Sequence, residues 1–395
     1  MAKDVVEILK EIGKVGLNAD GSYTRNAYSK EFFQAVDVIK GFMQELGMKI
    51  TTDAAGNVLG VLPGNKPELK HIIMGSHLDT VEKGGLYDGA YGVTGALAAL
   101  FALKEKNIKL NHTVEVYGFN GEEDALGGTF GSRAVTGLIA ADNKLLNEGI
   151  QTYGHTVEEI LACKRDLKNA KCYLELHIEQ GERLDEKKIN IGVVSGIVGI
   201  VRYKVVAHGT SNHAGSTQMF RRKDALVGMS KLIVKGNELC KKIDPDMVFT
   251  VGTITCAPGA KNVIPGRVEC CFEMRQLEKA KTDALIAAIK AAAPEIPDCD
   301  FTFEPEMYAP GVLCNPKIME TLQTVAKTNS LSYVVMPSGA GHDAESMGHH
   351  IPIGMIFVPS KDGFSHCKEE WTSDKDLQNG VKVMSGALEL LDKEA

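Results

Sequence analysis

The sequence predicts an α/β protein in which one domain is interrupted by another, and three observations lead to this fold class. Strand-like apolar runs alternate with helical patterns up to about residue 196. From Ile197 the order becomes β-α-β-β-α-β, which is the order of the split ferredoxin-like unit. Patterns of the first kind resume after Pro310-Gly311. Because 395 residues exceed one ordinary domain, we predict a discontinuous α/β domain, residues 1–196 and 312–395, with an inserted α+β domain at 197–311.

Composition narrows the class of protein and its partners. The chain is 44% hydrophobic and 24% charged, as in soluble globular proteins, and its net charge of −7 argues against a nucleic-acid-binding surface. The N-terminus has no apolar core of a signal peptide, and no apolar run approaches the ~18–20 residues of a membrane span. The nine cysteines are odd in number and form no C-x-x-C pair, so reduced thiols are expected. We predict a cytoplasmic protein without a nucleic-acid or membrane partner.

In the first domain, apolar periodicity indicates helices, and short apolar or alternating runs between turn residues indicate strands. A glycine-rich loop, 124–132, and a turn, 133–137, separate two of the strands, and the loop matches no phosphate-binding motif. The expected helices are 5–17, 29–46, 92–104, 316–329 and 374–392. The expected strands are 58–62, 71–74, 113–120, 172–179, 332–336 and 352–358.

Polar side chains that suit a hydrolytic metal follow four of these strands. The carboxyl ends of strands are where α/β sheets bind ligands, and imidazole and carboxylate are common ligands of hydrolytic metals. Each group alone can be explained as ordinary loop polarity or as a solvated surface pair. Adjacent Glu122 and Glu123, however, repel one another unless a cation or a shared proton relieves them. The four groups are His77 with Asp88, Glu122 with Glu123, His177, and His366.

The side chain of His177 is expected on the polar face of its strand, because Leu174, Leu176 and Ile178 alternate with it. The inserted domain carries its own polar groups, in the loop 211–216 and at Asn262 and Arg275. A surface loop histidine and a strand-end charge would account for His213 and Arg275 without any function. The elements expected in the insert are 198–207, 222–242, 249–256, 267–275, 278–293 and 301–308.

Seven motifs, spread over nearly the whole chain, resemble the M20 metallopeptidase superfamily and, within it, the hydantoinase/carbamoylase branch. ELHIEQG in particular is typical of this branch rather than of the peptidases and deacetylases of the superfamily. The motifs are GSHLDTVEKGGLYDGAYGV from Gly75, Glu122-Glu123, ELHIEQG at 175–181, NHAG at 212–215, NVIP at 262–265, SGAGHDA at 338–344 and GFSH at 363–366.

The resemblance implies a metal site of two divalent ions, Zn²⁺ or Mn²⁺, with Co²⁺ or Ni²⁺ as options. Asp88 would bridge the ions, Asp79 would hydrogen-bond the other nitrogen of His77, and Glu122 would be the general base. The ligands implied are His77, Asp88, Glu123, His177 and His366.

The substrate contacts implied by the resemblance come from both domains. His213 would stabilise the oxyanion from the partner subunit of a homodimer, while Asn262 and Arg275 would hold the substrate carboxylate. Gln180 and His342 would contact the ureido group or the substrate near the metal. The inserted domain would then serve as a lid and dimerisation domain. The reaction implied is hydrolysis of an N-carbamoyl-L-amino acid to the amino acid, ammonia and CO₂.

Three departures from the family pattern lie around the substrate rather than at a ligand. The usual Glu-Glu-Gly-Ser-Arg-Phe is replaced by residues 122–127, EEDALG; the proline expected before Met219 is Gln218; and Cys367-Lys368 replace Asn-Pro. Allantoate, ureidoglycolate and β-ureidopropionate therefore remain alternative substrates. More remote alternatives are an aminoacylase or dipeptidase, and a non-catalytic relative.

Overall fold

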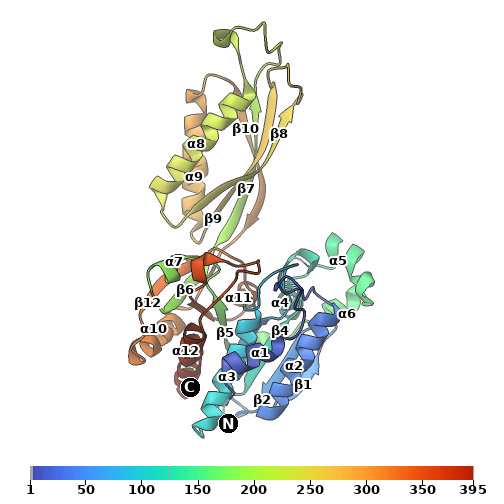
Figure 1. The fold of residues 1–395 in the computed structure, drawn as a ribbon, viewed down its shortest axis with the longest axis vertical. Helices are drawn as coiled ribbons and strands as arrows, with labels where there is room; N and C mark the ends of the chain where they lie inside the picture. The colour runs from blue at the N-terminus through green and yellow to red at the C-terminus, as the bar shows by residue number, and fades with distance from the viewer. Residues whose placement is uncertain (1–2, 124, 395) are drawn as a thin grey trace. The chain divides into compact units, whose positions relative to one another are not determined.

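The computed structural model describes residues 3–123 and 125–394, and the chain separates into two compact units (Figure 1). Unit 1 consists of Met1–Gly196 and Leu313–Ala395, and unit 2 of Ile197–Val312. The predicted α/β class is confirmed. Asp124, which the predicted glycine-rich loop includes, lies outside the described residues.

In the described residues of unit 1, nine strands form one mixed sheet. Its order is β1-β2-β4-β3-β5-β13-β6-β11, with β12 paired to β6. The neighbours β4, β3, β5 and β13 are mutually parallel, so their carboxyl ends meet at one edge of the sheet. The strands are β1 (Lys49–Thr52), β2 (Val58–Leu62), β3 (His71–His77), β4 (Val114–Phe119), β5 (Ala170–Ile178), β6 (Ile191–Ile197), β11 (Val312–Leu313), β12 (Tyr333–Ser338) and β13 (Ile353–Val358).

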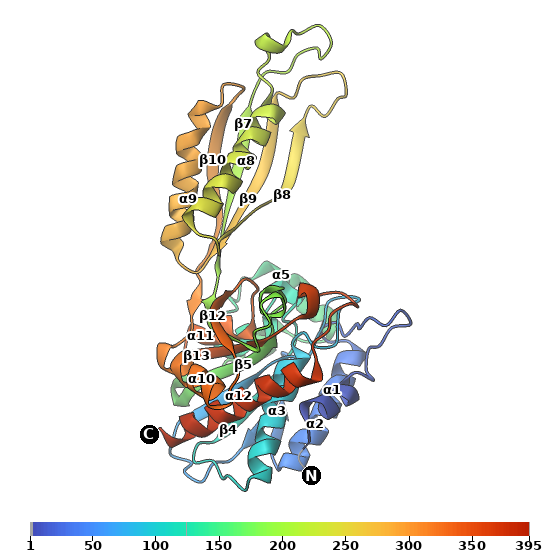
Figure 2. The ribbon, with the colours of Figure 1, turned by 60° about the vertical axis from the view of Figure 1, so that its left-hand side comes forward.

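The main core of unit 1 lies on one face of this sheet, under α3 and α12. Figure 2 shows these two helices side by side. Helix α3 is rich in Ala and Leu and is buried over nearly its whole length. The longer helices are α1 (Val5–Ile12), α2 (Lys30–Leu46), α3 (Ala90–Glu105), α10 (Pro316–Thr328) and α12 (Asp374–Lys393). The shorter ones are α4 (Phe130–Thr136), α5 (Lys144–Gly149), α6 (Val157–Leu161), α7 (Arg183–Glu186) and α11 (Asp343–Gly348).

The two faces of β5 have opposite chemistry. Leu174, Leu176 and Ile178 join the main core, as the alternation predicts. On the other face Glu175 and His177 are also fully buried, because α11 packs over this side. The Glu175 carboxylate accepts the Ser76 hydroxyl (2.6 Å) and the Ala344 N–H (2.8 Å). The polar face is therefore an interior surface rather than a solvated one.

The region after β4 differs from the prediction. The loop 124–132 and the turn 133–137 give way to a 3₁₀ turn, Ala125–Gly127, and to helix α4. Glycine is a poor helix former, so the sequence favours a loop here. Gly131 is needed inside α4 because a Cβ would lie 2.1 Å from Oδ1 of Asn57. Tertiary packing thus overrides the local preference.

One helix boundary and several shorter elements also differ from the prediction. Helix α1 ends at Ile12 rather than residue 17, because Gly13 caps it and Gly16 has a left-handed φ of 75°. The elements that were not predicted also include β1, β6, β11 and the short helices α5, α6, α7 and α11, and β6 pairs antiparallel with β13.

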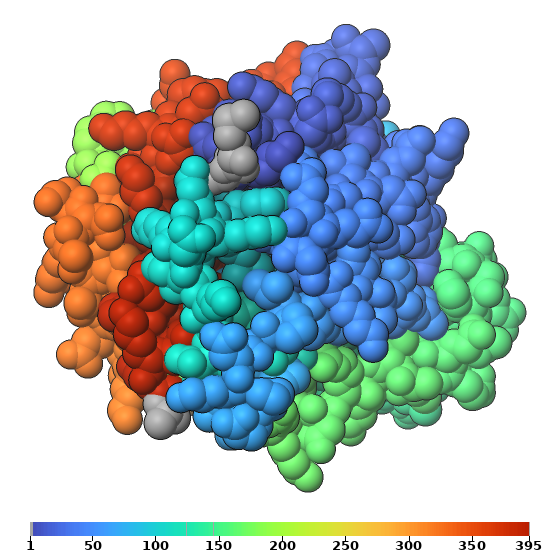
Figure 3. All heavy atoms as spheres, turned by 90° about the horizontal axis from the view of Figure 1, so that it is seen from below, coloured from blue at the N-terminus to red at the C-terminus, as the bar shows by residue number. Residues whose placement is uncertain are grey.

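The C-terminal helix is fastened to the edge of unit 1 that lies opposite the carboxyl ends of the parallel strands. The Asp392 carboxylate accepts the N–H groups of Asn111 (2.7 Å) and His112 (2.8 Å). Lys171 Nζ donates to the carbonyl oxygens of Leu391 (2.7 Å) and Glu394 (2.5 Å), which complements the negative end of a helix dipole. Figure 3 shows α12, in dark red, next to the cyan segment that follows α3.

Unit 2 is an antiparallel sheet in the order β10-β7-β9-β8, with α8 and α9 on one face (Figure 1). Its apolar core lies between helices and sheet. The element order is β-α-β-β-α-β, as predicted. The elements are β7 (Gly199–His208), α8 (Ala225–Ile243), β8 (Val248–Ala257), β9 (Arg267–Gln276), α9 (Lys279–Ala292) and β10 (Asp300–Ala309). Across the described part of the chain, every helix is too short or too polar to cross a membrane.

Candidate metal centre and functional site

The carboxyl ends of the four parallel strands bring the five predicted metal ligands together. His77 ends β3, Glu123 follows β4, His177 lies near the end of β5, and His366 follows β13. Asp88 lies in the loop between β3 and α3. The first four come from strands that are neighbours in the sheet, although 289 positions separate the first from the last in sequence.

The Asp88 carboxylate is the centre of this arrangement, and its two oxygens face different groups. Oδ1 lies 3.4 Å from Nε2 of His77 and 3.2 Å from Nε2 of His177. Oδ2 lies 3.3 Å from Nε2 of His366, which is itself 3.4 Å from Oε2 of Glu123. Two ligand groups therefore share Asp88: His77-Asp88-His177 and Asp88-Glu123-His366. In a further group of this kind, Glu122 and Glu123 lie beside His77.

Backbone carbonyl groups determine the tautomer of the two buried histidines that face Oδ1 of Asp88. Nδ1 of His77 lies 3.0 Å from the Asp79 carbonyl oxygen, and Nδ1 of His177 lies 2.9 Å from the Ile178 carbonyl oxygen. A carbonyl only accepts, so each Nδ1 carries a proton, and when the ring is neutral each Nε2 presents a lone pair. A neutral Nε2 beside a carboxylate oxygen is the arrangement of a metal ligand.

The structure corrects the role expected of the Asp79 side chain. Its carboxylate is 3.8 Å from Nδ1 of His77, and the hydrogen bond goes to the Asp79 carbonyl instead. The carboxylate accepts the backbone N–H groups of Gly121 (2.8 Å), Glu122 (3.2 Å) and Glu123 (3.2 Å). Asp79 therefore links the end of β3 to the pair of glutamates that follows β4.

Two buried asparagines hold the same glutamate segment from behind, and the sequence reasoning missed both. Asn57 Oδ1 accepts the Asn120 N–H (3.0 Å), and Asn57 Nδ2 donates to the Gly131 carbonyl (3.1 Å). Asn120 Nδ2 donates to the Ala55 carbonyl (2.8 Å). Asn57 lies in a D-A-A-G-N turn that has no metal-binding chemistry, so only its position identifies it.

Glu370 and Ser365 were also missed, although Ser365 lies inside the GFSH motif. Oε1 of Glu370 accepts the N–H groups of Tyr87 (2.8 Å) and Asp88 (3.1 Å). The Ser365 hydroxyl lies 2.7 Å from Oδ2 of Asp88 and 2.9 Å from Oε2 of Glu370. These contacts orient the shared carboxylate, and no local sequence pattern marks Glu370, because its partners Tyr87 and Asp88 lie more than 280 positions away.

The electrostatics of the cluster are those of a site that holds excess negative charge. Burial alone lowers the pKa of His77, but Glu122, Asp88 and Asp79 raise it well above the usual value. The hydrogen bond to Asp88 raises the pKa of His366 to about 9. Burial raises the pKa of Glu123 to about 7 and that of Glu122 well above its usual range. Without metal ions, protons on these side chains would balance the negative charge of the carboxylates. In a metal-loaded site, the cations would take over that role.

The donor set fits divalent metal ions. Among the described residues, Oε1 of Glu123 and Oε1 of Gln180 are buried side-chain oxygens without a hydrogen-bond partner. An unpaired buried oxygen is costly, and a cation held by Glu123 would remove that cost at its Oε1. Three imidazoles and two carboxylates are ligands suited to Zn²⁺, Mn²⁺, Co²⁺ or Ni²⁺.

Gln180 and His342, expected to contact substrate, lie next to the ligands. Gln180 Nε2 donates to Oδ2 of Asp88 (2.8 Å), and its backbone has a left-handed φ of 56°. His342 is buried edge-to-face against His177, with ring centroids 4.5 Å apart, and its Nε2 lies 2.9 Å from Oγ of Ser338. Burial raises the pKa of the neighbouring Asp343, another fully buried group that the sequence reasoning missed, well above its usual value.

Unit 2 separates its three predicted site residues into two places. His213 pairs with Val263, and the Ala214 N–H donates to the Asn262 carbonyl (2.9 Å), so the NHAG and NVIP segments form one loop pair. This pair lies beyond Arg267, at the start of β9. Arg275 lies at the other end of β9, about 27 Å away along eight extended residues. Within one chain, Asn262 and Arg275 are therefore not brought together.

Around Arg275 the sheet carries a small network of charges. Arg275 Nε donates to Oε1 of Glu273 (2.9 Å), and Arg202 Nε donates to Oε2 of the same residue (2.7 Å). Both arginines therefore contact the same carboxylate.

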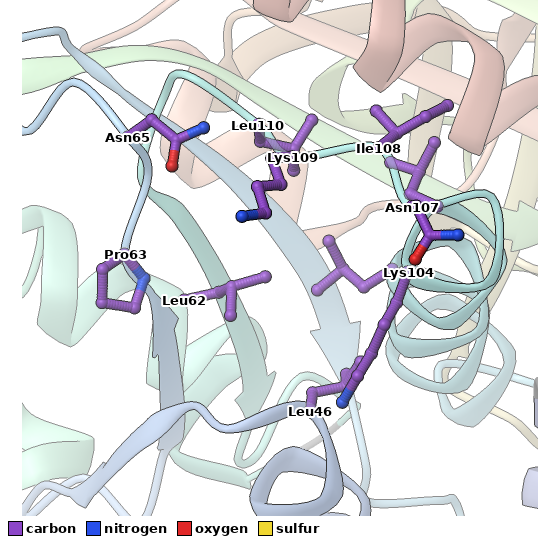
Figure 4. A pocket seen from close by; sticks show the side chains of 11 residues that line it. Leu46, Leu62, Pro63, Asn65, Lys104, Asn107, Ile108, Lys109 and Leu110 are labelled. Carbon is purple, nitrogen blue, oxygen red and sulfur yellow. The ribbon is translucent and has the colours of Figure 1, made fainter.

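A pocket of about 390 Å³ in unit 1 contains none of the predicted site residues (Figure 4). It is lined by Leu46, Leu62, Lys104 and the segment 107–110, among others. Leu62 of β2 is paired with Val114 at the start of β4, so the pocket lies at the amino end of the parallel strands. It is therefore remote from the chemistry of the carboxyl edge.

Comparisons with known proteins identify the family of this chain. Residues 73–390 match the model of Peptidase family M20/M25/M40. The chain is 33% identical over 393 residues to an N-carbamoyl-L-amino-acid amidohydrolase of Pseudomonas sp. (strain NS671), which covers 95% of each chain. It is 35% identical to an allantoate amidohydrolase of Bacillus subtilis (strain 168), over 97% of this chain and 96% of that protein.

The fold is also similar to that of a solved structure from the same group of amidases. A hydantoinase/carbamoylase family amidase from Burkholderia multivorans superposes with a TM-score of 0.88 at 28% identity, covering 99% of this chain and 97% of the other. The match of the family model over most of the chain, together with these full-length relatives, shows that the protein belongs to peptidase family M20/M25/M40, among its hydantoinase/carbamoylase amidases.

Proposed function

We propose that this protein hydrolyses the linear C–N amide bond of a ureido compound, with two divalent metal ions as cofactors. The observation that carries the proposal is the pair of ligand groups that share Asp88, with Glu122 beside them. His77 and His177 would hold one ion on the Oδ1 side of Asp88, and Glu123 and His366 would hold the other on the Oδ2 side. When bound, the ions supply Lewis acidity at the scissile carbonyl.

Glu122 is the general base of this proposal. It is adjacent to Glu123, its Oε2 lies 3.7 Å from Nε2 of His77, and burial raises its pKa. The carboxylate form of a group with a raised pKa takes a proton from the attacking water, and the carboxylic acid so formed returns it to the leaving nitrogen. Asp79 contributes by fixing the backbone of both glutamates through three hydrogen bonds.

Residues of unit 2 complete the site in a homodimer. His213 and Asn262 share one loop pair, whereas Arg275 of the same chain is about 27 Å away along β9. If all three touch one substrate, His213 and Asn262 come from one chain and Arg275 from the other. Arg275 then binds the substrate carboxylate and His213 the oxyanion. In this proposal residues 197–311 form a lid and dimerisation domain, and residues 1–196 with 312–395 form the catalytic domain.

The proposed substrate is an N-carbamoyl-L-amino acid, converted to the amino acid, ammonia and CO₂. Allantoate is the second candidate, because a full-length relative at 35% identity carries that name. Both compounds offer a carboxylate and a ureido group, while Gln180 and His342 would contact the ureido end. The proposed location is the cytoplasm, which the nine free cysteines support.

The test is ammonia release from protein stripped with a chelator and reloaded with Zn²⁺, Mn²⁺, Co²⁺ or Ni²⁺. The panel contains N-carbamoyl-L-amino acids, N-carbamoyl-β-alanine, allantoate, ureidoglycolate and one N-acetyl amino acid. We expect metal-dependent turnover of the carbamoyl amino acids. Turnover of allantoate alone would support the proposed mechanism but identify allantoate as the substrate. Turnover of only the N-acetyl compound, or of no compound, would refute the proposal.

Glu122→Gln is the matched variant for the general base. It keeps the size of the side chain and the five ligands, so we expect both metal ions to remain and the turnover number to fall about 10²–10⁴-fold. Retention of full activity in this variant would show that Glu122 is not the base.

A further inference from the structure

The turn that follows His213 binds the imidazole through backbone amides. The N–H groups of Gly215 and Ser216 both donate to Nδ1 of His213, each at 3.1 Å. The Asn212 side chain accepts the His213 N–H (2.8 Å), and the Thr217 hydroxyl donates to the His213 carbonyl (2.8 Å). The ring is therefore held by its own turn, although the residue is exposed.

These two hydrogen bonds select one tautomer of the ring. A nitrogen that accepts two N–H groups has a lone pair and no proton, so Nδ1 is unprotonated. In a neutral imidazole the proton then lies on Nε2. Nε2 becomes a hydrogen-bond donor pointing away from the turn, which is what an oxyanion requires.

Arg222 fastens the turn that provides those amides. Its Nη2 donates to the Ala214 carbonyl (2.6 Å), and its Nε donates to the Thr217 carbonyl (3.0 Å). The two carbonyls flank the Gly215 and Ser216 amides in sequence. One planar guanidinium thus spans the turn, which the single ammonium of a lysine does less well.

We propose that Arg222 is a positioning residue that, through the turn 214–217, holds His213 as an Nε2–H donor for the reaction. The proposal rests on the function proposed above for His213. Arg222 is partly exposed and fastens a surface turn rather than the apolar core of unit 2. Its removal should therefore affect the ring of His213 more than the fold.

The neighbouring Arg221 provides a matched control. It carries the same charge one position earlier, but its guanidinium lies 5.7 Å from the centroid of the exposed Phe220 ring. Arg222→Met and Arg221→Met remove the same charge and add the same side chain. A difference between them therefore reports the contacts with the turn and not the loss of a positive charge.

The first measurement is a ¹⁵N spectrum of the full-length, metal-loaded protein with labelled histidine, at about pH 8, where an ordinary imidazole is neutral. A spectrum of His213→Gln assigns the resonances of His213. We expect an unprotonated, hydrogen-bonded Nδ1 in the native protein and in Arg221→Met. In Arg222→Met, the ¹⁵N chemical shifts of both ring nitrogens should move towards the averaged values of a free histidine. The shifts in Arg222→Lys should lie between those of Arg222→Met and those of the native protein.

The second measurement separates kcat from KM, with N-carbamoyl-L-alanine or allantoate as substrate. We expect Arg222→Met to lower kcat about tenfold with KM changed less than threefold, and Arg221→Met to leave both unchanged. Deletion of an oxyanion donor costs about 10²–10³-fold, and misplacing it should cost less. Circular dichroism and the melting temperature verify that each variant is folded. If Arg222→Met does not fold, Arg222→Lys takes its place in both measurements.

The outcomes separate this inference from the proposed function. A protonated Nδ1 in the native protein, or identical spectra of native protein and Arg222→Met, would overturn the inference even if the enzyme is active. Equal kinetic effects of Arg221→Met and Arg222→Met would also overturn it. If no ureido compound is hydrolysed, the proposed function fails, while the spectra still decide whether Arg222 controls the His213 ring.

Discussion

The histidines of the two units are fixed by the backbone in opposite ways. In unit 1, Nδ1 of His77 and Nδ1 of His177 donate to carbonyl oxygens, so in the neutral ring Nε2 presents a lone pair towards Asp88. In unit 2, Nδ1 of His213 accepts two N–H groups, so Nε2 carries the proton. The backbone partner of Nδ1 thus distinguishes a metal ligand from a hydrogen-bond donor.

The two regions also differ in burial, and this decides what a mutation should cost. His177, on β5, is 1% exposed, and it lies under α11 beside the other predicted ligands. Its replacement should therefore disturb packing, charge balance and metal binding together. His213 lies on an exposed turn, so its replacement should affect only the reaction. Four predictions, from the largest effect to the smallest, test this contrast.

His177→Gln should have the largest effect. It removes one member of the proposed ligand group His77-Asp88-His177 and leaves Oδ1 of Asp88 facing an amide. We expect loss of one of two metal ions per chain, measured by elemental analysis, with activity at least about 10³-fold lower and a lower melting temperature. Full metal content in this variant would contradict the assignment of His177 as a ligand.

His213→Gln should lower activity but not stability. Removing an oxyanion donor costs about 10²–10³-fold in kcat, and an exposed side chain contributes little to folding. Metal content and melting temperature should equal those of the native protein. A clear fall in either would show that the turn of unit 2 has a structural role that the exposed position does not suggest.

Asp79→Asn should weaken metal binding without removing a ligand. The amide has one accepting oxygen in place of two, so at least one of the three N–H groups of Gly121, Glu122 and Glu123 loses its acceptor. Loss of a residue that orients metal ligands typically costs about 10–100-fold in affinity. Titration of chelator-stripped protein with Zn²⁺ measures the change, and an unchanged affinity would contradict the positioning role.

The pH dependence of the metal-free protein should give the smallest effect. The pKa of Glu123 is raised to about 7 and that of His366 to about 9, in a cluster with Glu122, Asp88, His77 and His177. A group whose pKa is higher in the folded than in the unfolded protein stabilises the fold at pH values below its unfolded-state pKa. This stabilisation is lost as the pH rises through the folded-state pKa. The melting temperature of metal-free protein should therefore fall between about pH 4.5 and 9.

Metal-loaded protein is the control for that measurement. Bound cations replace the protons, and the ligands bind metal more tightly as pH rises. Its melting temperature should not show the same decline towards pH 9. Equal declines with and without metal would mean that the carboxyl edge of unit 1 does not govern the pH response.

Much of the site was predictable because its ligands follow recognisable strands. The apolar run before His77 and the alternation around His177 indicate strand ends, and parallel strands place their carboxyl ends at one edge. The helix 29–46 was predictable for a similar reason, since Ser29 caps its start and Gly47 adopts a left-handed conformation at its end. Such signals are local, and each depends on a few neighbouring residues.

The misses share a different origin. Asn57, Glu370 and the true partner of the Asp79 carboxylate depend on contacts between residues 42 to 283 positions apart. Helix α4 forms in a glycine-rich run because Gly131 packs against Asn57. No local pattern reports such contacts.

The amino-acid sequence alone determined the fold class, the longer helices, most of the strands that carry the site, and the family, because hydrophobic periodicity and motif spacing are written along the chain. The tertiary structure decided which oxygen of Asp88 faces which histidine, which nitrogen of each histidine is protonated, and the separation of Arg275 from Asn262. The physical reason is that hydrogen-bond partners and register arise only when distant segments pack, and protonation follows from those partners.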